Sequence, residues 1–171
     1  ASGDCNLILC PPASYLDAVA TALELNNGHS PSGVALGGQN LHDQPKGAFT
    51  GEVAPGMLID IGCTFCIVGH SERRTLFGET DSVVNTKAKA ALTAGLTPII
   101  CVGETLEERE QDRTAAVVTE QISGSLAGLN ATDLARSIIA YEPVWAIGTG
   151  KVATPEQAQE VHALIRNQLA L

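Results

Sequence analysis

The sequence predicts an α/β fold in which short parallel strands alternate with helices. Two observations lead to this prediction: five short apolar runs have the length and residue types of strands, and helical patterns lie between them. The connections are too long for hairpins, so consecutive strands should run parallel with right-handed crossovers. This pattern leaves two architectures open, a doubly wound sheet and a part of a (β/α)8 barrel.

Each predicted strand is a short apolar run bounded by polar or turn-forming residues. The first ends at Pro11 and Pro12, which cannot continue the pairing of a central strand. The third is rich in β-branched and aromatic residues, which favour extended backbone. The predicted strands comprise residues 6–10, 33–37 with the next few positions, 63–68, 96–102 and 137–141.

The predicted helices begin at residues that favour helix N-termini. Ser14 and Asp81 are predicted N-caps, and Gly95 is predicted to end the helix that begins at Asp81. Thr105 and Glu108 form a capping-box pattern, which opens a long helix whose Glu- and Arg-rich first half should face solvent. The predicted helices comprise residues 14–25, 52–60, 71–77, 81–94, 105 to about 124, and 154 onward with Pro155 at the first helical position.

The composition indicates one globular domain over residues 1–171. Hydrophobic residues make up 44% and charged residues 17%, which is typical of a chain with a sizeable core. The net charge is −9 and the ten basic residues are scattered, so no nucleic-acid partner is expected. No stretch approaches the roughly 18 apolar residues of a membrane span, and no signal-peptide pattern precedes the first strand.

Five cysteines, an odd number, lie mainly in apolar strand-like runs. This arrangement is typical of reduced, buried thiols in a cytoplasmic protein. Cys63 and Cys66 have C-x-x-C spacing, but residues i and i+3 of a strand point to opposite faces of the sheet. One metal ion could not easily bind both thiolates, and no second such pair exists, so we predict no metal site.

The two ends of the sequence raise a further expectation. The chain starts at Ala1 rather than at a methionine, and it stops at Leu171 inside an apolar-periodic segment. That last segment contains no helix stop signal. We therefore expect a truncated chain.

Polar residues directly follow three of the predicted strands. His70 follows the third strand, Glu104 the fourth and Glu142 the fifth. The C-terminal ends of parallel strands share one face of the sheet, and active sites of such folds lie there. We therefore expect a general base at the end of one strand and a histidine at the end of another to converge.

Five segments of the chain, in order and spacing, resemble the triosephosphate isomerase family. The resemblance extends over essentially the whole chain, and the Tyr-Glu-Pro-Val-Trp stretch with its glycine loop is highly specific. The segments are Gly47-Ala-Phe-Thr-Gly-Glu52, Val68-Gly-His-Ser-Glu-Arg-Arg74, Cys101-Val-Gly-Glu-Thr105, Ala140-Tyr-Glu-Pro-Val-Trp-Ala-Ile-Gly-Thr-Gly-Lys151 and Ala153-Thr-Pro-Glu-Gln-Ala-Gln-Glu-Val-His162.

This resemblance implies a partial (β/α)8 TIM barrel of about five parallel βα units, a single truncated domain over residues 1–171. Compared with the family's barrel, the first strand and helix and the last two βα units would be missing. The implied activity is that of a triose-phosphate isomerase, which interconverts dihydroxyacetone phosphate and D-glyceraldehyde 3-phosphate in glycolysis and gluconeogenesis. The resemblance also implies a cytoplasmic homodimer that binds a small phosphorylated triose and uses no cofactor.

The resemblance assigns roles to individual residues. Glu142 would be the base that moves a proton between adjacent carbons, and a neutral His70 would be the electrophile that donates a proton to the enediolate oxygens. Cys101 would pack under the base and help to place it. Glu72 would pair with an active-site lysine, and Thr50 would reach across a dimer interface into the neighbouring subunit's site.

The loop after the fifth predicted strand should act as a lid that excludes water from the site. Gly148 and Gly150 permit unusual backbone angles and close approach to an anion, and Ile147 with Gly148 would bind the substrate phosphate. The loop does not match a nucleotide P-loop, because Trp145 and Val152 stand where that motif requires Gly and Ser or Thr. The other lid residues are Pro143, Val144, Trp145, Ala146, Thr149, Gly150 and Lys151.

Two alternatives remain open at this stage. The chain could be a catalytically incompetent barrel fragment, because the lysine strand and the C-terminal phosphate loops would be absent. Such a fragment should self-associate to cover edge strands and an exposed apolar barrel interior. The chain could also be an unrelated phosphosugar- or nucleotide-binding α/β domain, although Pro11 and Pro12 stand where such a domain has a Gly-rich turn.

Overall fold

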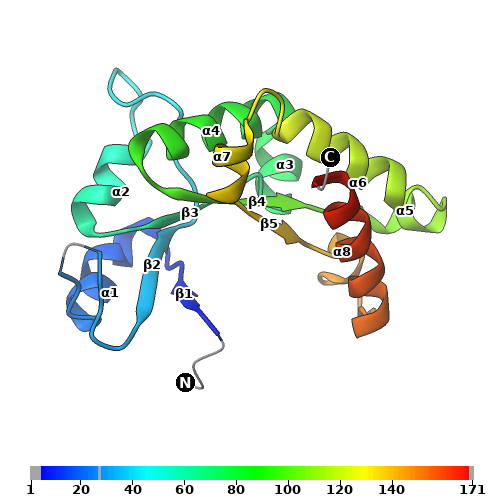
Figure 1. Cartoon of the computed structure of the whole chain (residues 1–171), viewed down its shortest axis with the longest axis horizontal. Coiled ribbons are helices and arrows are strands. Elements are labelled where there is room, and N and C mark those ends of the chain that lie inside the picture. The colour runs from blue at the N-terminus through cyan, green and yellow to red at the C-terminus, as the bar shows by residue number, and fades with distance from the viewer. Residues whose placement is uncertain (1–4, 27, 170–171) are drawn as a thin grey trace. The chain divides into compact units, whose positions relative to one another are not determined.

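The computed structural model describes residues 5–26 and 28–169. Among them, five strands are hydrogen-bonded in the order β1-β2-β3-β4-β5, and β2 pairs in parallel with both β1 and β3. A doubly wound sheet reverses its strand order partway, whereas this sheet follows the order of the chain, as a (β/α)8 barrel does. The predicted fold class, about five parallel βα units of such a barrel, is therefore confirmed. The strands, labelled in Figure 1, are β1 (Leu7–Leu9), β2 (Val34–Gly38), β3 (Phe65–Val68), β4 (Thr97–Val102) and β5 (Ile138–Tyr141).

Helices occupy the connections between the strands, as the sequence predicts. Pro55 and Pro155 each stand at the first position of a helix, where the missing N–H is not needed. Two short 3-10 turns, Ala13–Tyr15 and Val144–Ala146, add to the helices. The helices are α1 (Leu16–Ala22), α2 (Pro55–Ile61), α3 (Ser71–Phe77), α4 (Asp81–Ala94), α5 (Leu106–Glu110), α6 (Thr114–Ser125), α7 (Ala131–Ala135) and α8 (Pro155–Leu169).

The chain divides into two compact units, of which the first comprises the described residues of 1–68, 86–99 and 129–138. Its helices approach the sheet closely: a methyl group at Gly38 would lie 2.9 Å from the Leu58 side chain. The buried hydrophobic residues of this unit are Leu16, Ala20, Leu36, Leu41, Ala54, Leu58, Cys63, Cys66, Val68, Ala88, Ala91, Leu92 and Leu96.

The cysteines of the first unit are free thiols. Cys63 and Cys66 are buried, as predicted, whereas Cys10 is partly exposed and Cys5 is exposed. Burial, together with a smaller effect of the nearby Cys10, raises the pKa of Cys63 to about 11. Burial also raises the pKa of Cys66. These thiols therefore stay protonated near neutral pH and behave as small apolar side chains.

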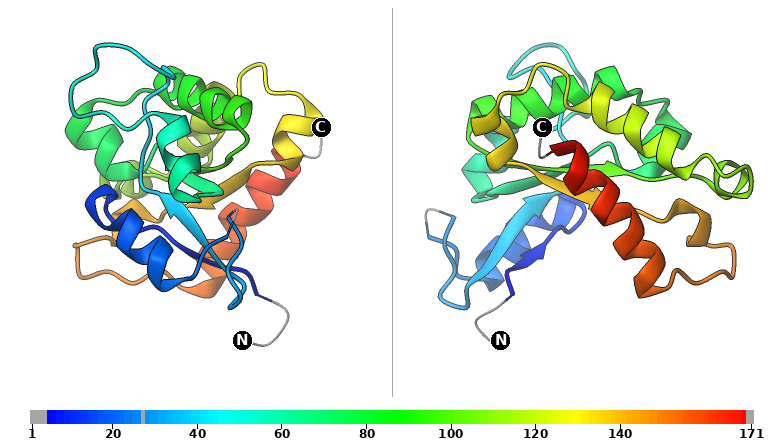
Figure 2. Two further views of the ribbon diagram at one scale, coloured as in Figure 1. Left: turned by 90° about the vertical axis from the view of Figure 1, so that its left-hand side faces the viewer. Right: turned by 45° about the vertical axis from the view of Figure 1, so that its right-hand side comes forward.

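The second unit comprises residues 69–85, 100–128 and the described part of 139–171. Within it, α6 and α8 pack side by side, as the right-hand view of Figure 2 shows. Two buried residues of each helix and one residue of β4 form a single apolar cluster. The cluster consists of Val102, Val118, Ile122, Val161 and Ile165.

Two predicted N-caps are wrong. Ser14 lies inside the 3-10 turn that precedes α1, and the first turn of α1 has no side-chain cap. Asp81 is the first residue of α4, and the Thr80 hydroxyl accepts the hydrogen bond from the Val83 N–H at 3.4 Å instead. The Asp81 carboxylate binds Arg74 at 2.6 Å, so an ion pair takes the oxygen that a cap would use.

The long helix predicted after Thr105 is also wrong, although its capping box with Glu108 is present. The helix α5 ends after one turn because Asp112 adopts a left-handed backbone conformation with φ 55°, and α6 begins two residues later. The short helix α7 was not predicted. Its signal was in the sequence, since Asn130 and Asp133 form a capping box.

Candidate active site

His70 and Glu142 meet in the second unit. His70 follows β3 and Glu142 follows β5, so both stand at C-terminal ends of strands. The Nε2 atom of His70 lies 3.0 Å from Oε1 of Glu142, and the two side chains are 34% and 14% exposed. The predicted convergence of these two residues is therefore present in the structure.

The hydrogen bonds of His70 define its protonation pattern. His70 is the N-cap of α3, and its Nδ1 accepts a hydrogen bond from the Glu72 N–H at 3.3 Å. A nitrogen that accepts carries no proton, so the ring proton of neutral His70 is on Nε2, the nitrogen that lies 3.0 Å from Glu142 Oε1. The 3.8 Å contact between Nδ1 and the Glu72 carboxylate is then no ion pair. The ring is thus set to donate from Nε2.

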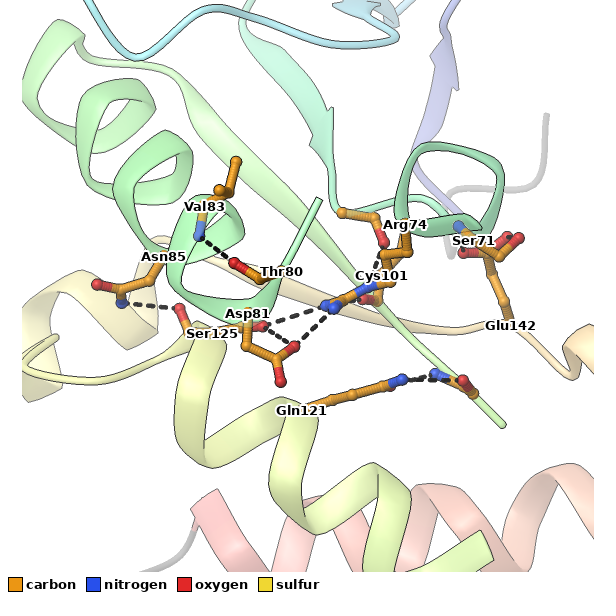
Figure 3. Close-up of polar contacts among 12 residues, drawn as sticks. Ser71, Arg74, Thr80, Asp81, Val83, Asn85, Cys101, Gln121, Ser125 and Glu142 are labelled. Atoms are coloured by element: carbon orange, nitrogen blue, oxygen red, sulfur yellow. Dashed lines mark hydrogen bonds and ion pairs between the residues drawn. The ribbon is translucent and has the colours of Figure 1, made fainter. Parts of the chain in front are cut away.

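Ser71 completes the hydrogen bonding of the Glu142 carboxylate. Its N–H donates to Oε2 and its hydroxyl to Oε1, each at 3.0 Å. Figure 3 shows the two residues next to each other. Together with His70, Ser71 satisfies a carboxylate that is largely buried. The role of Ser71 was not predicted from the sequence, because the contact joins positions 71 residues apart.

Arg74 fixes the backbone on both sides of the site. Its guanidinium donates to the carbonyl of Gly69 at 2.8 Å and to that of Cys101 at 3.2 Å. It also contacts Asp81 and Ser125, and the whole group is drawn in Figure 3. The fork of donors on one side chain therefore ties the turn before His70 to the end of β4.

Gly69 is required for the turn that presents His70. Its φ of +70° lies in the left-handed region, and a Cβ there would come within 2.7 Å of the Val84 side chain.

Cys101, at the end of β4, is 3% exposed. Its carbonyl binds Arg74, whereas its predicted packing under Glu142 stays a prediction.

Glu104 is the most buried charged group near this region, with an exposure of 0%. Its carboxylate binds Arg109 at 2.8 Å, the Thr114 hydroxyl at 3.2 Å and the Tyr141 hydroxyl at 3.1 Å. Arg109 in turn lies over the Trp145 ring at 4.4 Å. The prediction that the first half of this helix only faces solvent is therefore wrong for Arg109, because a buried carboxylate five residues earlier needs a cation.

The surroundings of Tyr141 change the pKa of its hydroxyl. The pKa of its hydroxyl is raised to about 12, chiefly by burial; the hydrogen bond from Trp145 lowers this pKa and the Glu104 carboxylate raises it. The phenol therefore stays protonated near neutral pH and donates to Glu104. It accepts from the indole N–H of Trp145 at 3.3 Å.

The loop that follows Glu142 is fixed at its beginning and exposed further on. Trp145 is 4% exposed, and its backbone N–H donates to the backbone carbonyl of Glu104 at 3.2 Å. Ile147 is 54% and Val152 is 82% exposed. Gly148 and Gly150 adopt φ values of 69° and 77°, which favour glycine.

Two further predicted residues, Glu72 and Thr50, are exposed. The Glu72 side chain is 74% exposed, and its pairing with a lysine stays a prediction. Thr50 is an exposed turn residue of the first unit. Among the described residues, no group of three or more His, Cys, Asp or Glu side chains could hold a metal ion. No helix in the described part of the chain is long and apolar enough to cross a membrane.

Comparison with known proteins gives a consistent family. The model of the triosephosphate isomerase family matches residues 1–171. Relatives named triosephosphate isomerase include those of Herpetosiphon aurantiacus, 53% identical over 98% of this chain, and Carboxydothermus hydrogenoformans, 56% identical over 96% of it. The relative from Endomicrobium trichonymphae is 54% identical over 94% of the chain. The matches cover 64%, 63% and 62% of these relatives, respectively, so the chain spans a little under two thirds of their length. The chain belongs to the triosephosphate isomerase family.

Proposed function

We propose that this chain carries the catalytic pair of a triose-phosphate isomerase, which interconverts dihydroxyacetone phosphate and D-glyceraldehyde 3-phosphate. The observation that supports this most directly is the 3.0 Å contact between His70 Nε2 and Glu142 Oε1. A carboxylate base and an imidazole N–H donor at one site match the needs of proton transfer next to a carbonyl. The family of the chain gives the same activity.

In the proposed reaction, Glu142 removes a proton from the hydroxymethyl carbon of dihydroxyacetone phosphate. The C–H electron pair forms the C=C bond of an enediol, and the carbonyl oxygen takes a proton from Nε2 of His70. Proton transfer between the two oxygens through the imidazole then leaves the neighbouring carbon ready to accept the proton held by Glu142. The product is the aldose phosphate, and both side chains return to their starting protonation states.

The surroundings support the chosen roles. The Glu72 N–H at Nδ1 keeps the His70 proton on the nitrogen that faces Glu142. The donors of Ser71 hold the carboxylate in one orientation before substrate arrives.

The remaining roles are part of the same proposal. The loop from Pro143 to Lys151 acts as the lid, with Ile147 and Gly148 near the substrate phosphate, and its exposure beyond Trp145 supports this. Cys101 packs beneath Glu142, and Glu72 binds a lysine. The reaction uses no cofactor and serves glycolysis and gluconeogenesis in the cytoplasm.

We also propose that the chain forms one domain that assembles as a homodimer. Leu76 and Phe77 on α3 are 73% and 67% exposed, which is unusual for large apolar side chains and supports an interface there. In the first unit, Thr50 lies beside Phe49, which is 44% exposed. Thr50 would reach the site of the neighbouring subunit.

The test is an isomerase assay on the 171-residue chain beside Glu142→Gln and the exposed-position control Glu160→Gln. We expect activity that falls about 10²- to 10⁴-fold in Glu142→Gln, because the general base is lost, and stays unchanged in Glu160→Gln. Equal rates in all three proteins would overturn the proposal. That result would favour the self-associating, inactive fragment, which sedimentation velocity would detect as oligomers other than a dimer.

A further inference from the structure

Gln121 on α6 holds the backbone of a residue that touches Glu142. Its side-chain carbonyl accepts from the Gly103 N–H at 2.7 Å, and its amide donates to the Gly103 carbonyl at 3.1 Å. Figure 3 labels Gln121, whose side chain extends from α6 to a dashed polar contact. A side chain that binds both polar groups of one residue fixes the position and the rotation of that residue.

Gly103 in turn lies directly against Glu142. A methyl carbon at Gly103 would be 1.7 Å from the carbonyl oxygen of Glu142 and 2.8 Å from its carbonyl carbon. No side chain fits there, so the two backbones are in contact without intervening atoms. Any movement of Gly103 toward Glu142 must therefore displace the residue that we propose as the base.

The residues on either side of Gly103 strengthen this contact. The Val102 carbonyl accepts from the Glu142 N–H at 2.8 Å, and the Glu104 carbonyl accepts from the Trp145 N–H at 3.2 Å. Three consecutive residues, 102 to 104, thus set the path of the chain from Glu142 into the loop. The middle one is held by Gln121.

We propose that Gln121 is a positioning residue for Glu142, acting through Gly103. It touches neither the carboxylate nor the imidazole, and its effect is to keep the backbone of Glu142 where the carboxylate reaches both His70 and Ser71. This inference rests on the proposed function for its catalytic consequence. Its structural part, the link from Gln121 to the Ser71–Glu142 hydrogen bond, stands without it.

The test compares Gln121→Met, which removes both hydrogen bonds, with Gln121→Glu, which keeps an acceptor for the Gly103 N–H. Gln111→Met is the matched control, because Gln111 is exposed and, among the hydrogen bonds described, its side chain binds only the Glu107 side chain. We expect Gln121→Met to lower kcat about 10- to 100-fold with little change in KM, since misplaced reacting groups slow the chemical step. Gln121→Glu should recover part of kcat, and Gln111→Met should match the parent chain.

A second measurement separates this inference from the proposed function. Amide hydrogen exchange at Ser71, whose N–H donates to Glu142 Oε2, reports the carboxylate position without substrate. We expect Ser71 exchange to rise roughly tenfold in Gln121→Met under conditions where the chain remains folded. If the parent chain shows no isomerase activity but Ser71 exchange still rises, the proposed function fails and the positioning role holds. Faster exchange at Gly103 with unchanged exchange at Ser71 would overturn the positioning role, whatever the activity.

Discussion

The loop from Pro143 to Ala153 is attached to its surroundings in two contrasting ways. At its beginning, Trp145 is buried, binds the Glu104 carbonyl and Tyr141, and lies under Arg109. At its far end, Lys151 reaches Glu110 across solvent at 3.0 Å, with side chains 46% and 62% exposed. The two attachments involve adjacent residues of α5, Arg109 and Glu110, yet only the attachment at Trp145 is buried.

This difference indicates which contacts stabilise the ordered loop. Buried, multiply hydrogen-bonded ion pairs resist disruption because an unpaired charge in the interior is unfavourable. An exposed pair contributes little, since water and salt compete with it. A loop anchored in this way can move at its far end while its beginning stays fixed, as the proposed lid requires.

The sharpest test of the contrast makes the same substitution at both glutamates. Glu104→Gln leaves Arg109 without a carboxylate in a partly buried site, so we expect a loss of about 3 kcal/mol in the free energy of unfolding. Glu110→Gln removes an exposed pair and should cost less than about 0.5 kcal/mol. Urea denaturation of the two variants and the parent chain measures both. Equal losses would show that the two attachments do not differ.

A second test uses the pH dependence of the buried attachment. Because the pKa of Tyr141 is raised to about 12 in the folded chain from 10.0, its contribution to stability is complete below pH 10. That contribution decreases as the pH rises toward 12, since the unfolded state loses the phenol proton first. Cys63, with a pKa raised to about 11, adds a decrease of the same sign that begins near pH 9.

The variant Tyr141→Phe isolates the tyrosine part of this decrease. The difference in unfolding free energy between parent and variant should shrink between pH 10 and pH 12, because only the parent carries the titrating phenol. Tyr15→Phe, at an exposed position, serves as the control. A difference that stays constant over this interval would contradict the burial of the Tyr141 hydroxyl as the cause.

The sequence predicted some parts of the fold and the site better than others. Local patterns predicted the strands, the Thr105 capping box and the placement of His70 and Glu142, because turn chemistry and strand ends depend on neighbours in the chain. They did not predict the roles of Ser71 and Gln121. Ser71 contacts a residue 71 positions away, and Gln121 binds a backbone 18 positions away. Such partners become visible only when the strand order is known.

The contact between Arg109 and Glu104 also could not be predicted from the pattern along the helix. Its charged neighbours on α5 indicate a solvated face, and Glu107 and Glu110 are indeed exposed. The pattern along the helix carries no information about Glu104, which precedes the helix and is buried under Tyr141 and Thr114. A buried carboxylate requires a partner, and Arg109 is the cation within reach.

The smallest expected effect concerns the exposed attachment itself. Lys151→Met removes the pair with Glu110 and should change the free energy of unfolding by less than about 0.5 kcal/mol. The small loss should vanish in about 1 M salt, where charges are screened within roughly 3 Å. Urea denaturation at low and high salt measures this, with the exposed Lys89→Met on α4 as control. The same variant also tests whether the two attachments act independently. Because Trp145 holds the beginning of the loop, the backbone from Pro143 to Ala146 should keep its order in ¹⁵N relaxation of Lys151→Met, while Gly148 and Gly150 gain mobility. If the whole loop loosened together, the two attachments would form one cooperative unit, and the far end could not move on its own.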